Sequence, residues 1–227
     1  MPNTDPQVLY GEQYFAAYKD DPRRTSMQDA EYKRLTARLD VKIKKPRVYD
    51  IGCGLGDFLL RFTGWEKYGR EISVYAQQIA EGKGIVFRFD PRMVMDCVVM
   101  RGSLQHVPDP IETLKDAYSR LRPGGLLAII ATPDAGGLIY RLFQDLPALS
   151  ADFNYVVFSG KMLANVLKQL GFVDIEILHP YSGTPYAHPL RDAWRFLVRL
   201  LRGKGKPDFA WPGNMMEVYA RKPRPQA

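Results

Sequence analysis

Asp50-Ile-Gly-Cys-Gly-Leu-Gly56 is the stretch of sequence that decides the fold. It follows an apolar run at residues 47–51, which predicts a short buried strand, and it leads into a predicted helix at 56–61. The glycines allow the backbone to turn sharply and let a ligand approach closer than a Cβ atom would permit. Because ligands of open α/β sheets bind at the carboxyl ends of the strands, this stretch predicts a ligand-binding loop.

Outward from this loop, predicted strands and helices alternate along the chain. Further strands are predicted at residues 67–72, 85–89, 97–100, 126–131, 173–178 and 216–220, and helices at 74–81, 110–121 and 161–170. An N-terminal stretch, residues 5–39, is predicted to be mostly helical. The strands are continuously apolar rather than alternating, which is typical of a parallel sheet covered on both faces. The sequence therefore predicts an α/β fold.

The spacing of the loop discriminates between kinds of nucleotide site. The dinucleotide pattern Gly-x-Gly-x-x-Gly would need glycine where Asp57 stands, and the Gly-Lys-Ser/Thr ending of a P-loop is absent. An acid at a helix start would also repel a pyrophosphate, but not a nucleoside without phosphates. Glu71 ends the second predicted strand, where a carboxylate can accept hydrogen bonds from both hydroxyls of a ribose. Loop and acid together predict an adenosyl site, without specifying which adenosyl compound.

Composition sets wider bounds. At 227 residues with 46% hydrophobic residues, the chain suits one packed domain. Its two cysteines suggest neither a disulfide framework nor a metal site, and it has no membrane-spanning run or secretory signal, so we expect a cytoplasmic protein without a metal. The net charge of +7 suits nucleic acid, anionic lipid or acidic substrates, but a merely solvated basic surface is the favoured interpretation.

Several motifs, in order, resemble those of class I S-adenosylmethionine-dependent methyltransferases. They are residues 48–60, Gly69-Arg-Glu71, the strand 96–100 followed by Leu104-Gln-His-Val-Pro-Asp-Pro110, Leu121-Arg-Pro-Gly-Gly-Leu126, Ala131-Thr-Pro-Asp134, Leu170-Gly-Phe172 and the N-terminal pattern at 10–15. The resemblance covers nearly the whole chain. Within the superfamily, the chain is similar to the branch of ubiquinone-biosynthesis-like and glycan-cluster methyltransferases.

The resemblance implies a Rossmann-like fold with a seven-stranded, mostly parallel sheet, helices on both faces and an antiparallel last strand. It implies one methyltransferase domain over residues 1–222. Within it, residues 1–45 would form an N-terminal helical lid, 46–132 the cofactor-binding half, and 133–222 the substrate-side half with a C-terminal cap insertion. The basic, proline-rich tail at 223–227 is predicted to be disordered.

The resemblance also implies a site for S-adenosyl-L-methionine. The expected cofactor-binding residues are Asp50, Gly52, Cys53, Gly54, Gly56, Glu71, Ile72, Met100 and Arg101. In this scheme Asp50 orients the loop and the methionine amino group, Glu71 holds the ribose, and Ile72 packs on the adenine. Met100 and Arg101 line the sulfonium end. The link at 88–95 is short, and Asp90 is the candidate for contacting the adenine amine.

His106 is the candidate catalytic residue, because it follows the fourth predicted strand and faces the expected zone of methyl transfer. A base there could take the proton from an acceptor hydroxyl. The alternative, that His106 caps a helix or packs on the cofactor, stays open, since alignment alone supports much methyl transfer. Asp134 is a further candidate for acceptor contact, and residues 135–155 and 181–212 are expected to cover the acceptor.

The predicted function is methylation, by preference O-methylation, of a small-molecule, sugar or lipid-linked acceptor. The alternatives are a protein or RNA methyltransferase and a non-catalytic S-adenosylmethionine-binding domain. Nucleic acid is not expected as a partner, because no basic groove with interleaved aromatics is evident. The Asn/Asp-Pro-Pro-Tyr motif of amino-group methylation is also absent, and Arg101-Gly-Ser-Leu104 stands in its place.

Residues 190–202 predict an amphipathic helix, with Arg191, Arg195, Arg199 and Arg202 on one stripe. The favoured interpretation packs the apolar face on the domain and leaves the arginines in solvent. The alternative is a basic interfacial helix that contacts an anionic membrane or holds a lipid-linked acceptor.

Overall fold

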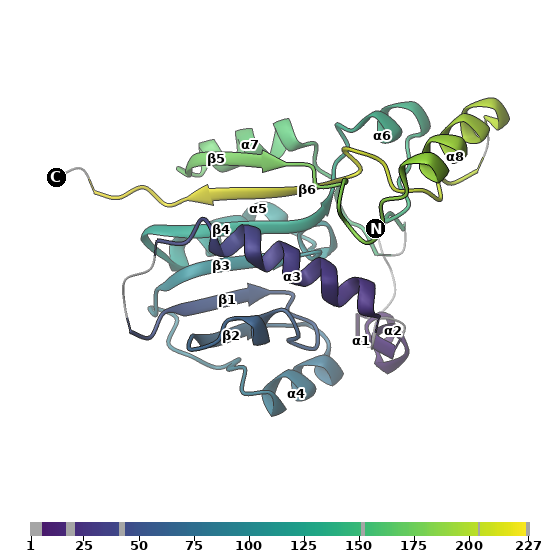
Figure 1. Ribbon diagram of the computed structural model, residues 1–227. Coiled ribbons are helices and arrows are strands. Elements are labelled where there is room, and N and C mark those ends of the chain that lie inside the picture. The colour runs from purple at the N-terminus through teal and green to yellow at the C-terminus, as the bar shows by residue number, and fades with distance from the viewer. Residues whose placement is uncertain (1–5, 17–20, 41–43, 151–152, 204, 226–227) are drawn as a thin grey trace.

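The computed structural model describes residues 6–16, 21–40, 44–150, 153–203 and 205–225. Its centre is a six-stranded sheet in the order β2-β1-β3-β4-β6-β5. The strands are β1 (Arg47–Ile51), β2 (Glu66–Arg70), β3 (Met95–Arg101), β4 (Leu121–Pro133), β5 (Val173–Leu178) and β6 (Met215–Arg221). The first four are parallel to one another, and β6 runs antiparallel to β4 and β5. The predicted Rossmann-like architecture with an antiparallel last strand is therefore present (Figure 1).

Helices cover both faces of this sheet. The helices are α1 (Pro6–Leu9), α2 (Glu12–Ala16), α3 (Pro22–Thr36), α4 (Val74–Gly82), α5 (Pro110–Arg120), α6 (Leu138–Phe143), α7 (Gly160–Gln169) and α8 (Pro189–Arg202). Buried side chains of α5 and α7 share one core cluster with the sheet, and those of α3 and α4 share the other. Every helix in the described ranges is too short or too polar to cross a bilayer.

The helix starts are encoded locally. Asp21, Ser73, Asp109 and Ser159 each precede a helix, and each side chain accepts a hydrogen bond from a backbone N–H of the first turn. Two of these helices also begin with proline, whose fixed φ suits that position. These caps set where α3, α4, α5 and α7 begin, and so where the preceding loops end.

The sequence predicts a strand at 85–89, which would give the sheet seven strands. This prediction is wrong within the described chain. There, Val86 forms a single parallel bridge with Tyr68 of β2 and no strand follows. The ring of Phe89 instead packs against Tyr49 and Tyr68, with centroids 5.5 and 4.8 Å apart. Burying this aromatic draws the chain away from the edge of β2, so the sheet ends there.

The prediction of a helix at 56–61 is also wrong. Gly54 and Gly56 both have positive φ, which an α-helix does not allow, and only a 3₁₀ turn at Leu59–Arg61 follows. The chain then turns again at Gly64, also at positive φ. The backbone between these glycines therefore forms turns and one 3₁₀ segment.

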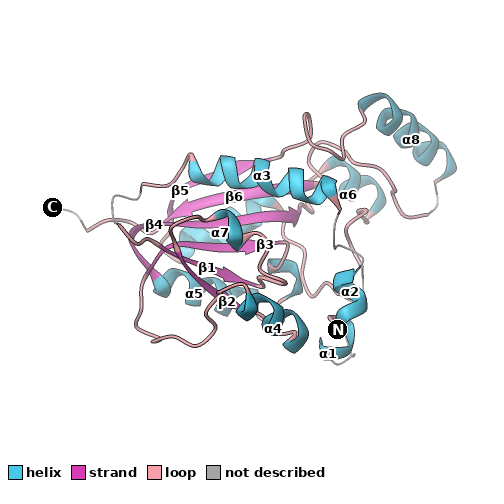
Figure 2. Ribbon diagram, turned by 60° about the horizontal axis from the view of Figure 1, so that its bottom comes forward, coloured by secondary structure: helices cyan, strands magenta, loops and turns pink. Residues whose placement is uncertain are grey.

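The N-terminal helices differ in what they cover. Helix α3 is a layer of the fold, lying along the sheet (Figures 1 and 2) with Leu35 fully buried. Arg34 of α3 forms an ion pair with the buried Glu217 of β6, and Arg38 pairs with Glu176 of β5. Among the N-terminal helices, α1, α2 and the first half of α3 border the cavity described below.

The C-terminal insertion builds a small separate core of Ile139, Leu146 and Phe209, from which α8 projects (Figure 2). In the predicted tail, residues 223–225 are irregular and Arg224 pairs with Asp40, while 226–227 lie outside the described residues.

Candidate functional site

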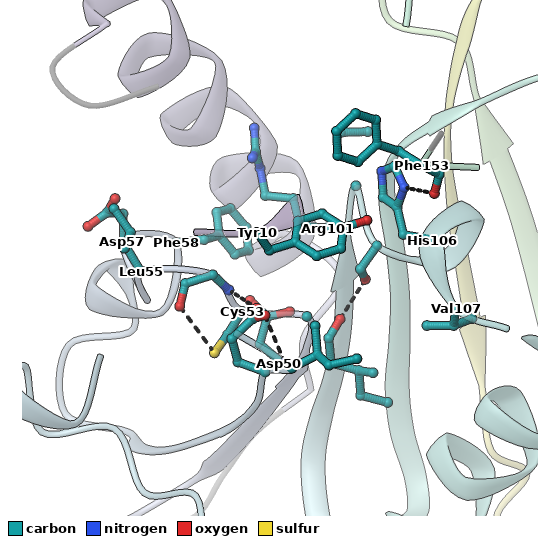
Figure 3. Close-up of a pocket in the computed structure, with 18 of the residues that line it drawn as sticks. Tyr10, Asp50, Cys53, Leu55, Asp57, Phe58, Arg101, His106, Val107 and Phe153 are labelled. Carbon is teal, nitrogen blue, oxygen red and sulfur yellow. Dashed lines mark hydrogen bonds between the residues drawn. The ribbon is translucent and has the colours of Figure 1, made fainter. Parts of the chain in front are cut away.

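A cavity of about 1090 Å³ lies at the carboxyl ends of the parallel strands. It is bordered by the glycine loop after β1, by the residues after β2 and β3, by α1 to α3, and by the segments around residues 153–155 and 186. Figure 3 shows the glycine loop on one side of this cavity and His106 with Phe153 on the other. The fold therefore brings together the two parts of the predicted site.

Gly52 and Gly54 line the cavity with φ of +82° and +55°, in the left-handed region that favours glycine. A Cβ atom on Gly52 would lie 2.5 Å from Cβ of Ser103, so the loop could not keep its path with any other residue there. Gly56 is different, because it is not among the lining residues. A Cβ there would lie 2.2 Å from Cδ1 of Ile85, so Gly56 permits close packing beneath the loop rather than contact with a ligand.

Asp50 lies at the floor of the cavity, and its side chain is almost wholly buried. Its Oδ1 has no hydrogen-bond partner among the described residues. Burial raises the pKa of this carboxyl to about 8, although the positive charge of Arg101 opposes the shift. A buried carboxylate oxygen without a partner fits a ligand ammonium group, which would supply both the charge and the hydrogen bond that the site lacks.

Glu71 connects the glycine loop to the residues that lead into α4 through hydrogen bonds. Its Oε2 accepts a hydrogen bond from the backbone N–H of Gly54 (2.8 Å), and its Oε1 accepts from those of Ile72 (2.8 Å) and Ser73 (2.9 Å). The carboxylate also lines the cavity, and Oε2, which accepts only one of these three hydrogen bonds, can accept a further one. Ile72 presents a half-exposed apolar side chain to the same cavity.

Cys53 lines the cavity as well, but it is a buried free thiol. Burial raises its pKa, so the thiol stays protonated and is a poor nucleophile.

Met100 and Arg101, which were both predicted to line the sulfonium end, have different surroundings in the structure. Arg101 lines the cavity, where its Nε lies 2.5 Å from Oε2 of the fully buried Glu31 on α3. Met100 does not line it: its side chain is fully buried in the core cluster beneath the sheet. Successive side chains of a strand point to opposite faces, so β3 cannot present both residues to the cavity. The assignment of Met100 is therefore corrected.

His106 is the lining residue best placed for proton transfer. Its Nδ1 lies 2.7 Å from the carbonyl oxygen of Phe153, and its Nε2 lies 3.2 Å from the amide nitrogen of Gln105. A carbonyl only accepts, so Nδ1 carries the proton in the neutral ring, and Nε2 accepts a hydrogen bond from the side-chain amide of Gln105. Burial lowers the pKa of His106 below its ordinary value, because it disfavours the charged form. The ring is thus held neutral in the tautomer that a base would need.

Aromatic rings from distant parts of the chain surround His106. Tyr10, Tyr14 and Phe153 all line the cavity, and the Tyr10 ring lies 5.7 Å from that of Phe153 and 6.3 Å from that of His106. Burial raises the pKa of Tyr10 to about 12, so its hydroxyl stays protonated. Of these rings, the sequence pointed only to the N-terminal pair, through the family resemblance. Phe153 and Glu31 carry no local signal, because only the fold brings them to the site.

Two other candidates lie away from the cavity lining. Asp134 caps a turn: its Oδ1 accepts from the N–H groups of Gly136 and Gly160, and its Oδ2 lies 2.6 Å from Nε2 of His179. Asp90 pairs with Arg92 in an exposed turn and is not among the residues that line the cavity. In the described part of the chain, no group of three or more potential ligands could hold a metal ion.

Comparison with known proteins adds to this geometry. A family model described as a methyltransferase domain matches residues 23–177. A tRNA U34 carboxymethyltransferase of Desulfotalea psychrophila is 27% identical over 187 residues, covering 74% of this chain and 58% of that protein. A ubiquinone biosynthesis O-methyltransferase of Parvibaculum lavamentivorans is 31% identical over 112 residues, covering 40% of this chain and 44% of that one. The chain thus spans about half the length of these relatives.

Among solved structures, the fold is similar to a S-adenosylmethionine-dependent methyltransferase of Thermotoga maritima, described as a possible histamine N-methyltransferase. The two superpose with a TM-score of 0.64 at 18% identity, over 94% of this chain and 98% of that one. At this identity, the similarity concerns the fold alone.

Proposed function

We propose that this chain, which belongs to the methyltransferase domain family, transfers the methyl group of S-adenosylmethionine to a hydroxyl of a small-molecule, sugar or lipid-linked acceptor. The observation that carries the proposal is the unpartnered Oδ1 of Asp50 beneath a glycine loop, in one cavity with Glu71. Asp50 would bind the ammonium group and Glu71 the ribose hydroxyls. These two groups lie at the two ends of a phosphate-free adenosyl amino acid. The similarity to a ubiquinone biosynthesis O-methyltransferase supports the ubiquinone-like branch and oxygen as the methylated atom.

In the proposed reaction, the residues of this chain bind and align. Gly52 and Gly54 let the backbone follow the ligand closely, and Ile72 offers an apolar surface for the adenine ring. S-adenosylmethionine, when bound, supplies an electrophilic methyl group on a sulfonium. Since that methyl is already activated, correct positioning of the acceptor provides most of the rate gain.

His106 has the proposed role of general base. Released from its hydrogen bond with Gln105, Nε2 would accept the proton of the acceptor hydroxyl while the bond from the methyl carbon to the sulfonium sulfur breaks and the new carbon–oxygen bond forms. The proton would then leave to solvent. The hydrogen bond from Nδ1 to the Phe153 carbonyl stabilises the imidazolium during this step. Tyr10 and Tyr14 exclude water from the face of the cavity next to the histidine.

Calorimetry tests the cofactor assignment directly. We expect heat of binding with S-adenosylmethionine and S-adenosylhomocysteine, and none with NAD or ATP. A wild-type chain that is folded by circular dichroism but gives no heat with either adenosyl compound would overturn the proposal, and would leave the fold without this chemistry. Release of S-adenosylhomocysteine with phenolic, sugar and lipid-linked hydroxyl compounds would then identify the acceptor class. We place this reaction in the cytoplasm.

A second candidate acceptor is RNA. The similarity to a tRNA-modifying enzyme and the net charge of +7 favour it. Methyl incorporation into total tRNA that exceeds incorporation into every hydroxyl compound would favour RNA over the preferred acceptor. Incorporation into the small compounds alone would eliminate it.

A further inference from the structure

Helix α8 presents its apolar stripe to solvent. Leu190, Trp194, Leu197 and Leu201 recur at spacings of four, three and four residues, which places them on one face of the helix. Their exposed fractions are 91%, 67%, 52% and 86%. Leu200, beside this stripe, is exposed as well. A row of large apolar side chains at this exposure is unusual in a folded domain and indicates an interaction surface.

The opposite face of α8 is the one that packs on the domain, which reverses the interpretation favoured from the sequence. Arg199 lies over the ring of Phe143, with Cζ 4.3 Å from the centroid, and Phe196 stacks on Trp211 at 4.7 Å. The buried Asp192 accepts hydrogen bonds from the hydroxyl of Tyr181 and the N–H of His188. These contacts determine how the helix is rotated, so its apolar stripe cannot turn inward without breaking them.

The charges of α8 complement an anionic surface. The helix carries four arginines and one acidic residue, and that residue, Asp192, is buried on the inner face. Arg191 and Arg202 are exposed. Because each residue advances roughly 100° around the helix, both lie on the same side of the apolar stripe. Nε of Arg191 lies 3.6 Å from Oδ1 of Asp192, while Oδ2 accepts the hydrogen bonds from Tyr181 and His188, and the Arg191 side chain stays half exposed. An apolar face with Trp194 and bordering arginines has the composition of a helix that lies in a membrane interface.

A second copy of the chain suits this surface less well. Antiparallel pairing of two α8 helices through their stripes would bring Arg191 of each copy toward Arg202 of the other. The helix has no exposed carboxylate to offset that repulsion.

We propose that α8 docks this protein on an anionic lipid surface, with its apolar stripe in the interface and Arg191 and Arg202 at the headgroups. The surface lies close to the site already described. Tyr186 lines the cavity, and α8 begins three residues later, at Pro189. Figure 1 shows α8 at the end of the molecule toward which β1 points, the same end as α1 and α2. Docking would therefore hold the cavity next to the bilayer.

Co-sedimentation with phosphatidylglycerol/phosphatidylcholine vesicles tests docking without cofactor or acceptor, so its result is independent of the proposed function. We expect binding at low salt that weakens strongly at high salt and is absent with phosphatidylcholine alone. Tryptophan emission should shift to the blue on binding, and the shift should disappear in Trp194→Phe. The control for that variant is Trp65→Phe, which leaves α8 unchanged.

Two double variants separate the apolar and the charged contributions. Trp194→Gln with Leu201→Gln should weaken binding by at least about tenfold. Arg191→Glu with Arg202→Glu should weaken it by about twentyfold or more at low salt. The matched controls, Met162→Gln on α7 and Arg92→Glu in the exposed turn, alter side chains that are similarly exposed but lie outside α8, and should leave binding unchanged.

Three results would overturn the proposal. One is a folded wild-type chain that stays in the supernatant at low salt with anionic vesicles. A second is equal loss of binding in the α8 variants and in their controls. The third is a lipid-free dimer, seen by sedimentation velocity, that dissociates in the Trp194→Gln/Leu201→Gln variant, because a second copy would then be the occupant of the stripe.

Discussion

Nδ1 of His106 lies 2.7 Å from the carbonyl oxygen of Phe153, a residue 47 positions further along the chain. This contact joins the 3₁₀ turn Leu104–His106 after β3 to the segment before α7, and it decides which ring nitrogen carries the proton. The remaining nitrogen, Nε2, keeps its lone pair and accepts a hydrogen bond from the side-chain amide of Gln105. Because burial also lowers the pKa of the ring, the neutral base is the dominant form at neutral pH.

The first prediction concerns His106 and pH. The pKa of the ring lies below its ordinary value of 6.5, so the rate at saturation should be level above about pH 7 and should fall as pH decreases through that lowered pKa. His106→Ala should reduce turnover about a hundredfold or more and leave cofactor affinity nearly unchanged. Rates and calorimetry on both proteins check this. If affinity falls while the saturated rate stays the same, His106 is a packing residue.

The second prediction concerns Asp50, whose pKa burial raises to about 8. Binding of an ammonium group favours the carboxylate, so cofactor binding at pH 7 should release up to about one proton, and affinity should rise with pH toward 8. Calorimetry in buffers of different ionisation enthalpy measures this release. Asp50→Asn should bind about tenfold to a hundredfold more weakly and should release no proton from this site.

The same group makes a prediction about stability without cofactor. The folded-state pKa of Asp50 is raised above the ordinary 3.8, so its contribution to the free energy of unfolding is fully present below about pH 3.8 and is lost as pH rises through about 8. Asp50→Asn removes that loss. Its melting temperature should exceed that of the wild type at pH 9 and approach it at low pH; a variant that melts lower at pH 9 would contradict a buried, unpartnered carboxylate.

The third prediction separates the two functions of Glu71. Glu71→Ala should weaken S-adenosylmethionine binding by roughly 1–3 kcal/mol, from lost hydrogen bonds to a charged acceptor. The three backbone N–H groups that it accepts from belong to the glycine loop and to the two residues that precede α4. The variant should therefore also exchange the amide hydrogens of Gly54 and Ser73 faster. Glu66→Ala, which removes an exposed ion pair at the other end of β2, serves as the control for both measurements.

The fourth prediction concerns the pairing of Arg101 with the buried Glu31. Removing one partner leaves a buried charge without compensation, so Arg101→Met should lower the free energy of unfolding by roughly 3–5 kcal/mol. The double variant Arg101→Met with Glu31→Leu should recover most of that loss. Urea unfolding of both checks this, and Arg92→Met, which removes an exposed pair, should change stability by less than about 0.5 kcal/mol.

Local patterns account for much of the fold. The runs at 47–51 and 173–178 are strands at those bounds, and the helices predicted at 74–81 and 110–121 begin at Val74 and Pro110. The exceptions have physical causes. The apolar run at 85–89 is no strand because burial of Phe89 against Tyr68 outweighs extension of the sheet.

For the site, the sequence alone determined which residues are available at the carboxyl ends of β1 and β2: the glycines, Asp50 and Glu71. This is possible because their signal is local, since a turn at positive φ requires glycine and a strand end places the next residue at the rim of the sheet.

Only the tertiary structure decided that Glu31 and Phe153 complete the cavity and that Met100 stays in the core. It also decided that α8 turns its apolar stripe outward. Periodicity defines the two faces of a helix or strand, but which face is buried depends on partners distant in sequence. For α8 those partners are Phe143, Tyr181 and Trp211, whose contacts with the arginine-bearing face compete with burial of the leucines.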